Sequence, residues 1–156
     1  MDEKSFNKVL EISEQFYGTA NDPEQIPINQ ESRDKLQKLH SKALIFTIEN
    51  SEPVSWTVIV PTSNKLAEKF LKGEISERDL LDMTEPAKQY EALYLCSAFT
   101  VPEYRKKGYA IKLLKEQINS IPHTANPLLF AWIYSQEGER LVDKLEQELG
   151  VKIHRR

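Results

Sequence analysis

Between residues 105 and 110 the chain reads Arg105-Lys106-Lys107-Gly108-Tyr109-Ala110, and the two flanks of this stretch decide the fold. Before it, residues 92–101 are rich in aromatic and aliphatic side chains. They predict a strand that ends at Pro102, because proline has no N–H to donate. After it, apolar residues at helical spacing predict a helix over 110–121. A strand that turns through one glycine into a helix leaves backbone N–H groups unpaired at the helix start, and these groups and the helix dipole favour phosphate oxygens.

The rest of the chain predicts further alternation of helices and strands. We expect helices over 3–17, 30–40 and 136–149, a loop over 18–28, and strands over 43–49, 54–60, 128–134 and 151–154. Residues 50–53 predict a hairpin turn, and 61–89 predict two short helices broken at Gly73. This order predicts an α/β (layered α+β) fold with a strand–helix–strand crossover over 92–134. We expect one domain, 1–156, with a helical insert at 61–89.

Length and composition exclude several classes of protein. The chain has 156 residues, 40% of them hydrophobic and 29% charged, as expected for a globular domain with a real core. A net charge of −3 argues against a dedicated nucleic-acid binder. Cys96 is the only cysteine, so no internal disulfide can form, and its apolar strand makes it a small hydrophobe by default. The charged N-terminus and the lack of long apolar runs predict no membrane partner and a cytoplasmic location.

The spacing Arg105-x-x-Gly108-x-Ala110 resembles a known signature. The pattern R/Q-x-x-G-x-G/A between a strand and a helix is similar to the pyrophosphate-binding signature of the GNAT superfamily of N-acetyltransferases. The similarity extends over most of the chain, from that superfamily's first helix onward. Two departures stand out: the first helix leaves no room for the usual opening strand, and 61–89 is helical where many relatives have a hairpin or a short loop.

The resemblance implies a cofactor, a cofactor site and the form of the sheet. It implies a mixed, mostly antiparallel sheet in which the motif strand splays from its crossover neighbour, with acetyl-CoA as cosubstrate in the wedge. The pantetheine arm would pair with Ala98, Phe99 and Thr100. The pyrophosphate would sit on the N–H groups of residues 105–110, which are Arg105, Lys106, Lys107, Gly108, Tyr109 and Ala110. Lys106 and Lys107 would add charge there, or be merely solvated. No metal is expected, because one cysteine and three scattered histidines lack metal-ligand spacing.

The catalytic half of the resemblance is incomplete. Val142 occupies the position of the tyrosine that commonly protonates the leaving thiolate, and Tyr134 is the nearest substitute, unless it is a rim aromatic with its hydroxyl in water. Tyr94 occupies the position at which histone-type members carry a glutamate base. Glu91, three residues earlier, is interpreted as a solvated carboxylate. Without a clear base, an α-amine with a pKa near 7.8 is favoured over a lysine amine near 10.4.

The expected activity is acetyl transfer from the CoA thioester to a primary amine, in a protein that could form a homodimer. The alternatives are a non-catalytic module that binds or senses acyl-CoA, and an interaction domain that has lost the cofactor. Trp56, Phe70 and Tyr90 are candidates for lining the acceptor site, with the core as the alternative location for each. The acceptor itself is not indicated by any motif.

Overall fold

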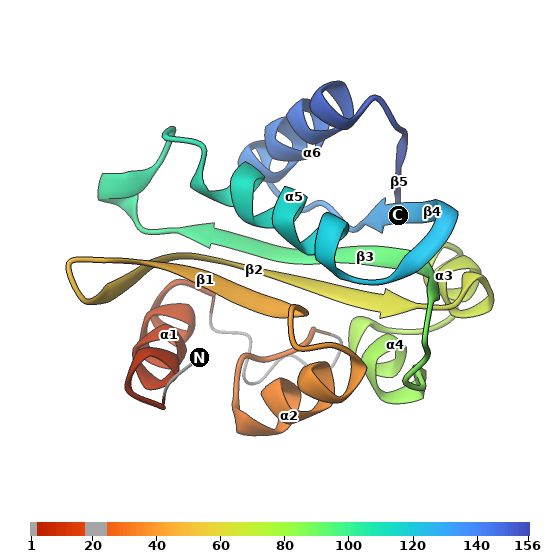
Figure 1. Cartoon of the computed structure of the whole chain (residues 1–156), viewed down its shortest axis with the longest axis horizontal. Coiled ribbons are helices and arrows are strands. Elements are labelled where there is room, and N and C mark those ends of the chain that lie inside the picture. The colour runs from red at the N-terminus through yellow and green to blue at the C-terminus, as the bar shows by residue number, and fades with distance from the viewer. Residues whose placement is uncertain (1–2, 18–24) are drawn as a thin grey trace.

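The computed structural model describes residues 3–17 and 25–156, which form an open five-stranded sheet with helices on both faces (Figure 1). The helices are α1 (Glu3–Tyr17), α2 (Gln30–Leu39), α3 (Asn64–Leu71), α4 (Glu77–Met83), α5 (Tyr109–Ser120) and α6 (Gln136–Leu149). The strands are β1 (Leu44–Glu49), β2 (Glu52–Thr62), β3 (Tyr90–Thr100), β4 (His123–Ala131) and β5 (Ile153–Arg155). Helices α5 and α6 cover one face, and α1 to α4 cover the other. The predicted layered α+β fold is confirmed at this level.

The sheet is mixed, with strand order β1-β2-β3-β4-β5. Strand β2 pairs antiparallel with β1 and β3, whereas β4 pairs parallel with β3 and β5. The antiparallel ladders are the longer ones. Each parallel pair needs a crossover connection, which α5 and α6 supply on the same face of the sheet. The predicted crossover through the helix after Gly108 is therefore present, and β3 is the strand that joins the two halves.

The predicted strand over 128–134 is wrong at both ends. Strand β4 begins at His123 and ends at Ala131, so 132–134 lie outside the sheet. Pro127 sits inside β4 at an irregularity, because the register with β3 jumps from Tyr90↔His123 to Ala92↔Leu128. A proline is tolerated where the regular ladder is interrupted, since its missing N–H then costs no ladder hydrogen bond.

Other predicted elements are confirmed with shifted bounds. The segment 61–89 contains the two helices α3 and α4, and Gly73 between them has φ +77°. The predicted turn over 50–53 is narrower, because only Asn50 and Ser51, with φ +52° and +65°, separate β1 from β2. The last strand is Ile153–Arg155 rather than 151–154. Of the predicted loop over 18–28, residues 25–28 are irregular and 18–24 lie outside the described residues.

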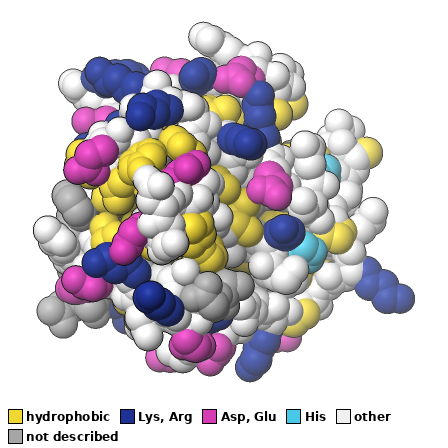
Figure 2. All heavy atoms as spheres, turned by 60° about the vertical axis from the view of Figure 1, so that its left-hand side comes forward, with side chains coloured by type: hydrophobic (Ala, Val, Ile, Leu, Met, Phe, Trp, Pro, Cys, Tyr) yellow, Lys and Arg dark blue, Asp and Glu magenta, His cyan; other side chains and the backbone are white. Residues whose placement is uncertain are grey.

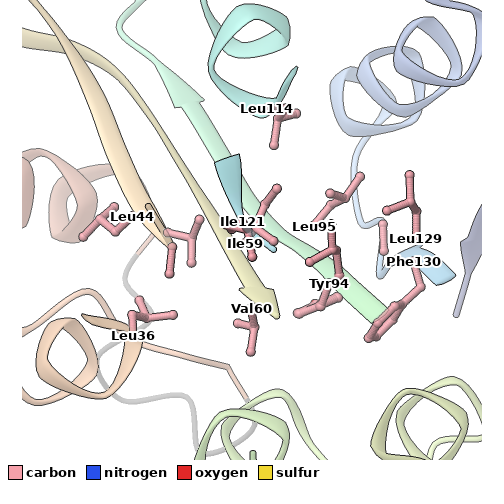
Figure 3. Close-up of a cluster of buried hydrophobic side chains, with 14 of the residues drawn as sticks. Leu36, Leu44, Ile59, Val60, Tyr94, Leu95, Leu114, Ile121, Leu129 and Phe130 are labelled. Carbon is pink, nitrogen blue, oxygen red and sulfur yellow. The ribbon is translucent and has the colours of Figure 1, made fainter. Parts of the chain in front are cut away.

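Alternate residues of β2 fill the core on the two faces of the sheet (Figure 3). Ile59 lies with Leu114 and Ile121 on the α5 side, and Val60 points toward Leu36 on the other. On that second face Tyr94 stacks on Phe130 at 5.1 Å and contacts Phe70 of α3 at 4.8 Å between ring centroids. The three aromatic residues proposed for the acceptor site are all in the core, which confirms the alternative location for Trp56, Phe70 and Tyr90.

A buried glutamine attaches α5 to the antiparallel half of the sheet. The amide oxygen of Gln117 accepts from the Thr57 hydroxyl at 2.6 Å. Its amide nitrogen donates to the carbonyl oxygens of Lys42, Ala43 and Thr57 at 2.8, 3.1 and 3.2 Å. Buried polar groups cost free energy when they lose their partners. The position of α5 above the sheet thus depends on polar contacts as well as on its apolar stripe.

Replacing this side chain by an apolar one tests that dependence. We expect Gln117→Leu to lower the free energy of unfolding by about 2–4 kcal/mol, because it leaves the Thr57 hydroxyl and nearby carbonyl groups without partners. Urea denaturation measures the change. Asn119→Leu, at an exposed position of the same helix, should change stability by less than about 0.5 kcal/mol. Equal effects of the two substitutions would contradict this role for Gln117.

Candidate functional site

Strands β3 and β4 separate halfway along β3. Their parallel pairing ends at Leu95↔Ala131, whereas β3 continues to Thr100 and stays paired with β2 as far as Ser55↔Thr100. The separation coincides with a β-bulge. Ile59 pairs with Leu95 and Val58 with Ser97, so Cys96 is the extra residue on β3. Bulges bend a strand and increase its twist. We call the place where β3, beyond Leu95, no longer pairs with β4 the β3–β4 opening.

Helix α5 begins beside the end of β3 that lies beyond this opening. Its N-cap is Gly108, with φ +83°, a left-handed conformation that favours glycine. The first-turn N–H groups of a helix lack intrahelical acceptors, and here the cap residue has no side chain to supply one. The side chains of Arg105, Lys106 and Lys107 are exposed just before this helix start. Figure 2 brings this end of the molecule forward, with basic and acidic side chains interspersed around exposed apolar surface.

Side-chain contacts join the strand end, the turn and the helix start. The Arg105 Nε donates to the Thr100 carbonyl oxygen at 2.9 Å, and its guanidinium lies 5.8 Å from the Phe99 ring centroid. The Tyr109 hydroxyl donates to Glu49 of β1 at 3.2 Å. The residues predicted for cofactor contact therefore lie in one continuous region, with Ala98, Phe99 and Thr100 on β3 beyond its last pair with β4.

On the other face of the sheet, at the base of the opening, lies a buried carboxylate that no sequence motif indicates. Glu77, the first residue of α4, is only 3% exposed. It accepts the Ile26 N–H at 2.8 Å and the Tyr94 hydroxyl at 2.5 Å, and the Tyr134 hydroxyl lies 3.5 Å from the same oxygen as Tyr94. The two tyrosines named as candidate catalytic residues, far apart in the chain, thus meet at this one side chain.

Two of the groups that face Glu77, the Tyr94 hydroxyl and the Cys96 thiol, stay neutral near pH 7. Burial raises the pKa of Tyr94 well above 10.0, and the charges of Cys96 and Glu77 add to the effect. Burial also raises the pKa of the Cys96 thiol well above 9.0, followed by the charge and hydrogen bonding of Glu77. The thiolate is the reactive form of cysteine. Cys96 is therefore suited to packing and not to nucleophilic attack, as its apolar strand indicated.

The local sequence does not indicate that Glu77 is buried, because residues 76–79 have the pattern of an ordinary helix start. Ser76 is the N-cap of α4, its hydroxyl accepts the Asp79 N–H, and Asp79 accepts the Ser76 N–H in return. Acidic residues are common in the first turn of a helix for electrostatic reasons alone. Only the tertiary contacts of its carboxylate, with the Ile26 N–H and the Tyr94 hydroxyl, show that Glu77 points inward. A glutamate between two capping residues carries no signal of burial.

Three other residues considered as candidates from the sequence make contacts that support the fold and do not reach the cluster around Glu77. Val142 is buried on α6 and offers no hydroxyl. Glu91 is exposed and accepts the Asn64 N–H at 3.0 Å. The His123 ring lies between the carbonyl oxygens of Thr124 and Ile118, at 2.7 and 3.1 Å. None of these three takes part in the cluster around Glu77.

Two surface hollows are lined by other residues than the opening. One, of about 140 Å³, is lined mainly by polar residues of α2, α4 and the segment before α2. The other, of about 260 Å³, lies between α3, the segment after α4 and the first residues of β3. Neither is lined by the β3 residues beyond Leu95, nor by Glu77. The strand separation is therefore the feature that defines the candidate site.

Comparison with known proteins does not assign the chain to a family. No protein-family model matches it, and no curated protein sequence matches it significantly. Within residues 3–17 and 25–156, no three His, Cys, Asp or Glu side chains are grouped so as to hold a metal ion. No helix in that part of the chain is long and apolar enough to cross a membrane. The site must therefore be interpreted from its own geometry.

The raised pKa of Tyr94 has a consequence for stability at alkaline pH. A group whose pKa is raised by folding contributes stability that is complete below its ordinary pKa, here 10.0, and is lost as pH rises through the native value. We expect Tyr94→Phe to lower the free energy of unfolding at pH 7 by about 1.5–3 kcal/mol, because a hydrogen bond to a buried carboxylate is lost. We also expect its stability to decline less between pH 9 and 11 than that of the unchanged protein.

Denaturation curves at several pH values measure both effects. Tyr104→Phe is the matched control, because Tyr104 is only half-buried and lies near the start of α5, packed edge-to-face against Tyr109. It should leave the alkaline decline unchanged. Parallel declines for Tyr94→Phe and the unchanged protein would contradict the assignment.

Proposed function

We propose that the chain is a GNAT-type N-acetyltransferase, which moves an acetyl group from the thioester of acetyl-CoA to a primary amine. The observation that carries the proposal is the combination of two features at one place. Strands β3 and β4 part at Leu95↔Ala131, and α5 begins at a left-handed glycine, Gly108, beside the end of β3. The resemblance of the turn to the pyrophosphate signature supports the same conclusion.

The cofactor would occupy the opening and the start of α5. The pantetheine arm would run along Ala98, Phe99 and Thr100, where β4 has left the sheet. The pyrophosphate would bind the N–H groups of the turn and of the first turn of α5, supported by the helix dipole and the nearby cationic side chains. Apart from its neighbours in the chain, a Cβ on Gly108 would meet no protein atom within 4 Å, so space next to this backbone is open to a ligand.

The reaction is a direct transfer. The neutral amine attacks the thioester carbonyl carbon, so that a C–N bond forms and the C–S bond breaks. A backbone N–H of β3 would polarise the carbonyl oxygen. The CoA thiolate leaves and takes a proton from the attacking nitrogen, which becomes an amide. A thiol pKa near 8.5 makes the thiolate a fair leaving group, so Val142 in place of a tyrosine does not prevent the reaction. The neutral thiol of Cys96 favours this route over an acyl-cysteine intermediate.

A second candidate function is a module that binds acyl-CoA without turnover. It is favoured by the buried Val142 and by Tyr94, which stand where, by the resemblance, GNAT enzymes carry a tyrosine and histone-type members a glutamate. Release of free CoA thiol in the presence of amines distinguishes the two functions. It occurs only in the enzyme, whereas both functions require acetyl-CoA binding.

Acetyl-CoA binding measured by calorimetry tests the cofactor site. We expect micromolar affinity for the unchanged protein and at least a roughly tenfold loss, equal to about 1.4 kcal/mol, for Gly108→Glu, because a carboxylate there repels the pyrophosphate. Gly150→Glu is a matched control. Gly150 also has a positive φ, +66°, with open space around its Cβ position, but it ends α6 instead of starting α5.

The control separates backbone strain from loss of the site. Gly150→Glu should bind acetyl-CoA within about twofold of the unchanged protein, since it adds the same charge and similar strain elsewhere. Absence of binding by the unchanged protein would overturn both the enzyme and the binding module.

A further inference from the structure

We infer that Glu77 accepts the proton of the acceptor amine through the Tyr134 hydroxyl, so the amine reaches the thioester from the sheet face covered by α3 and α4. The inference rests on the proposed acetyl transfer. It assigns the base that the motif strand lacks to a different element, the helix α4 of the inserted segment.

Tyr134 connects the buried carboxylate with the surface. Glu77 is 3% exposed, whereas Tyr134 is 58% exposed, and the Tyr134 hydroxyl lies 3.5 Å from the Glu77 Oε2. The Tyr134 ring contacts Trp132 at 5.1 Å between centroids, and Trp132 lies 6.0 Å from Phe70. The Arg156 guanidinium already covers these two rings, at 4.3 Å from the Trp132 centroid and 4.5 Å from that of Phe70. A substrate amine at the Tyr134 hydroxyl would thus have a proton acceptor behind it.

The two faces of β3 keep the cofactor and the acceptor apart. Ala98 pairs with Thr57, whose hydroxyl bonds to Gln117 of α5, so this face of the sheet looks toward α5. Tyr94 pairs with Val60 and contacts Phe70 of α3, so its side chain looks the other way. Acyl-CoA held at the start of α5 and an amine beside Tyr134 would therefore meet across the opening.

The proton step balances without any further reactant. The ammonium form of the acceptor gives one proton to the Tyr134 oxygen while the Tyr134 hydroxyl proton passes to Glu77. The neutral amine then attacks, the leaving thiolate takes its second proton, and Glu77 later returns the first proton to water. Tyr94 and Cys96 on β3 also face Glu77, and both keep their protons near neutral pH. The Arg156 guanidinium lies close by, because it donates to the carbonyl oxygen of Ile75 at 3.3 Å. Glu77 is therefore the group of this cluster suited to accept a proton.

The need for a base depends on the acceptor and on pH. At pH 7 roughly one α-amine in seven is neutral, but only about one lysine amine in 2,500. Raising the pH supplies neutral amine without help from the protein. A variant that lacks only the base should therefore recover as pH rises, whereas a variant that is merely misfolded should not.

The test uses Glu77→Gln, which keeps the shape of the side chain but cannot take up the proton. Two probe acceptors are used: a peptide whose only amine is its N-terminus, and an Nα-blocked peptide with one lysine. With the lysine probe we expect Glu77→Gln to lower amine-dependent release of CoA thiol at pH 7 by about 100-fold or more, with a deficit at least roughly tenfold smaller at pH 9. With the α-amine probe the loss at pH 7 should not exceed about sevenfold, because roughly one α-amine in seven is already neutral there. Calorimetry should give an acetyl-CoA affinity within about twofold of the unchanged protein.

Tyr134→Phe and Glu74→Gln complete the experiment. Tyr134 is exposed, so Tyr134→Phe tests the relay without disturbing the core, and we expect about a tenfold loss of rate at an unchanged melting temperature. Glu74, exposed between α3 and α4, is the matched acid that should change nothing.

Each result decides between distinct conclusions. With the lysine probe, a rate for Glu77→Gln within about threefold of the unchanged protein, or a deficit that is the same at pH 7 and pH 9, would overturn the role of Glu77 alone. Acetyl-CoA binding by the unchanged protein without thiol release from either probe would overturn the transfer reaction together with this inference. Absence of acetyl-CoA binding would overturn the cofactor site itself.

Discussion

The burial of the Glu77 carboxylate is the constraint on which the arrangement of the α3–α4 face depends. Removing a carboxylate from water costs several kcal/mol unless hydrogen bonds replace the lost hydration. Here the replacements come from separate parts of the chain: the Ile26 N–H before α2 and the Tyr94 hydroxyl on β3. All of these groups must be in place together, so α4, the segment before α2 and β3 have one mutual arrangement that satisfies the charge.

Strand β3 imposes the second constraint, because it belongs to both halves of the sheet. It pairs with β2 as far as Thr100 but with β4 only as far as Leu95. The bulge at Cys96 lies at the point of separation, where the added twist directs β3 away from its parallel neighbour. The same strand then leads into the turn before α5, so an opening in the sheet and a helix start lie next to each other by the connectivity of the chain.

These two constraints give the proposed site two chemically different sides. The α5 side offers helix N–H groups and the cationic residues 105–107, as suits an anionic cofactor. The α4 side offers a buried carboxylate that faces two phenol hydroxyls, as suits an amine that must lose a proton. The proposed enzyme therefore needs neither a tyrosine at Val142 nor a glutamate at Tyr94. In the proposed enzyme, Glu77 of α4 would supply the proton acceptor that β3 does not carry.

The sequence alone determined the order of the elements and the place of the turn before α5, because hydrophobic periodicity and the positions of glycine and proline are local properties. It also indicated that 61–89 is helical and broken at Gly73. The bounds predicted for β4 were wrong, because the irregular register that accommodates Pro127 is a property of the pairing with β3. Only the tertiary structure decided that Glu77 is buried and that Tyr94 and Tyr134 converge on it. A charged side chain can be buried only where groups distant in the sequence supply its hydrogen bonds, and no local sequence pattern indicates those partners.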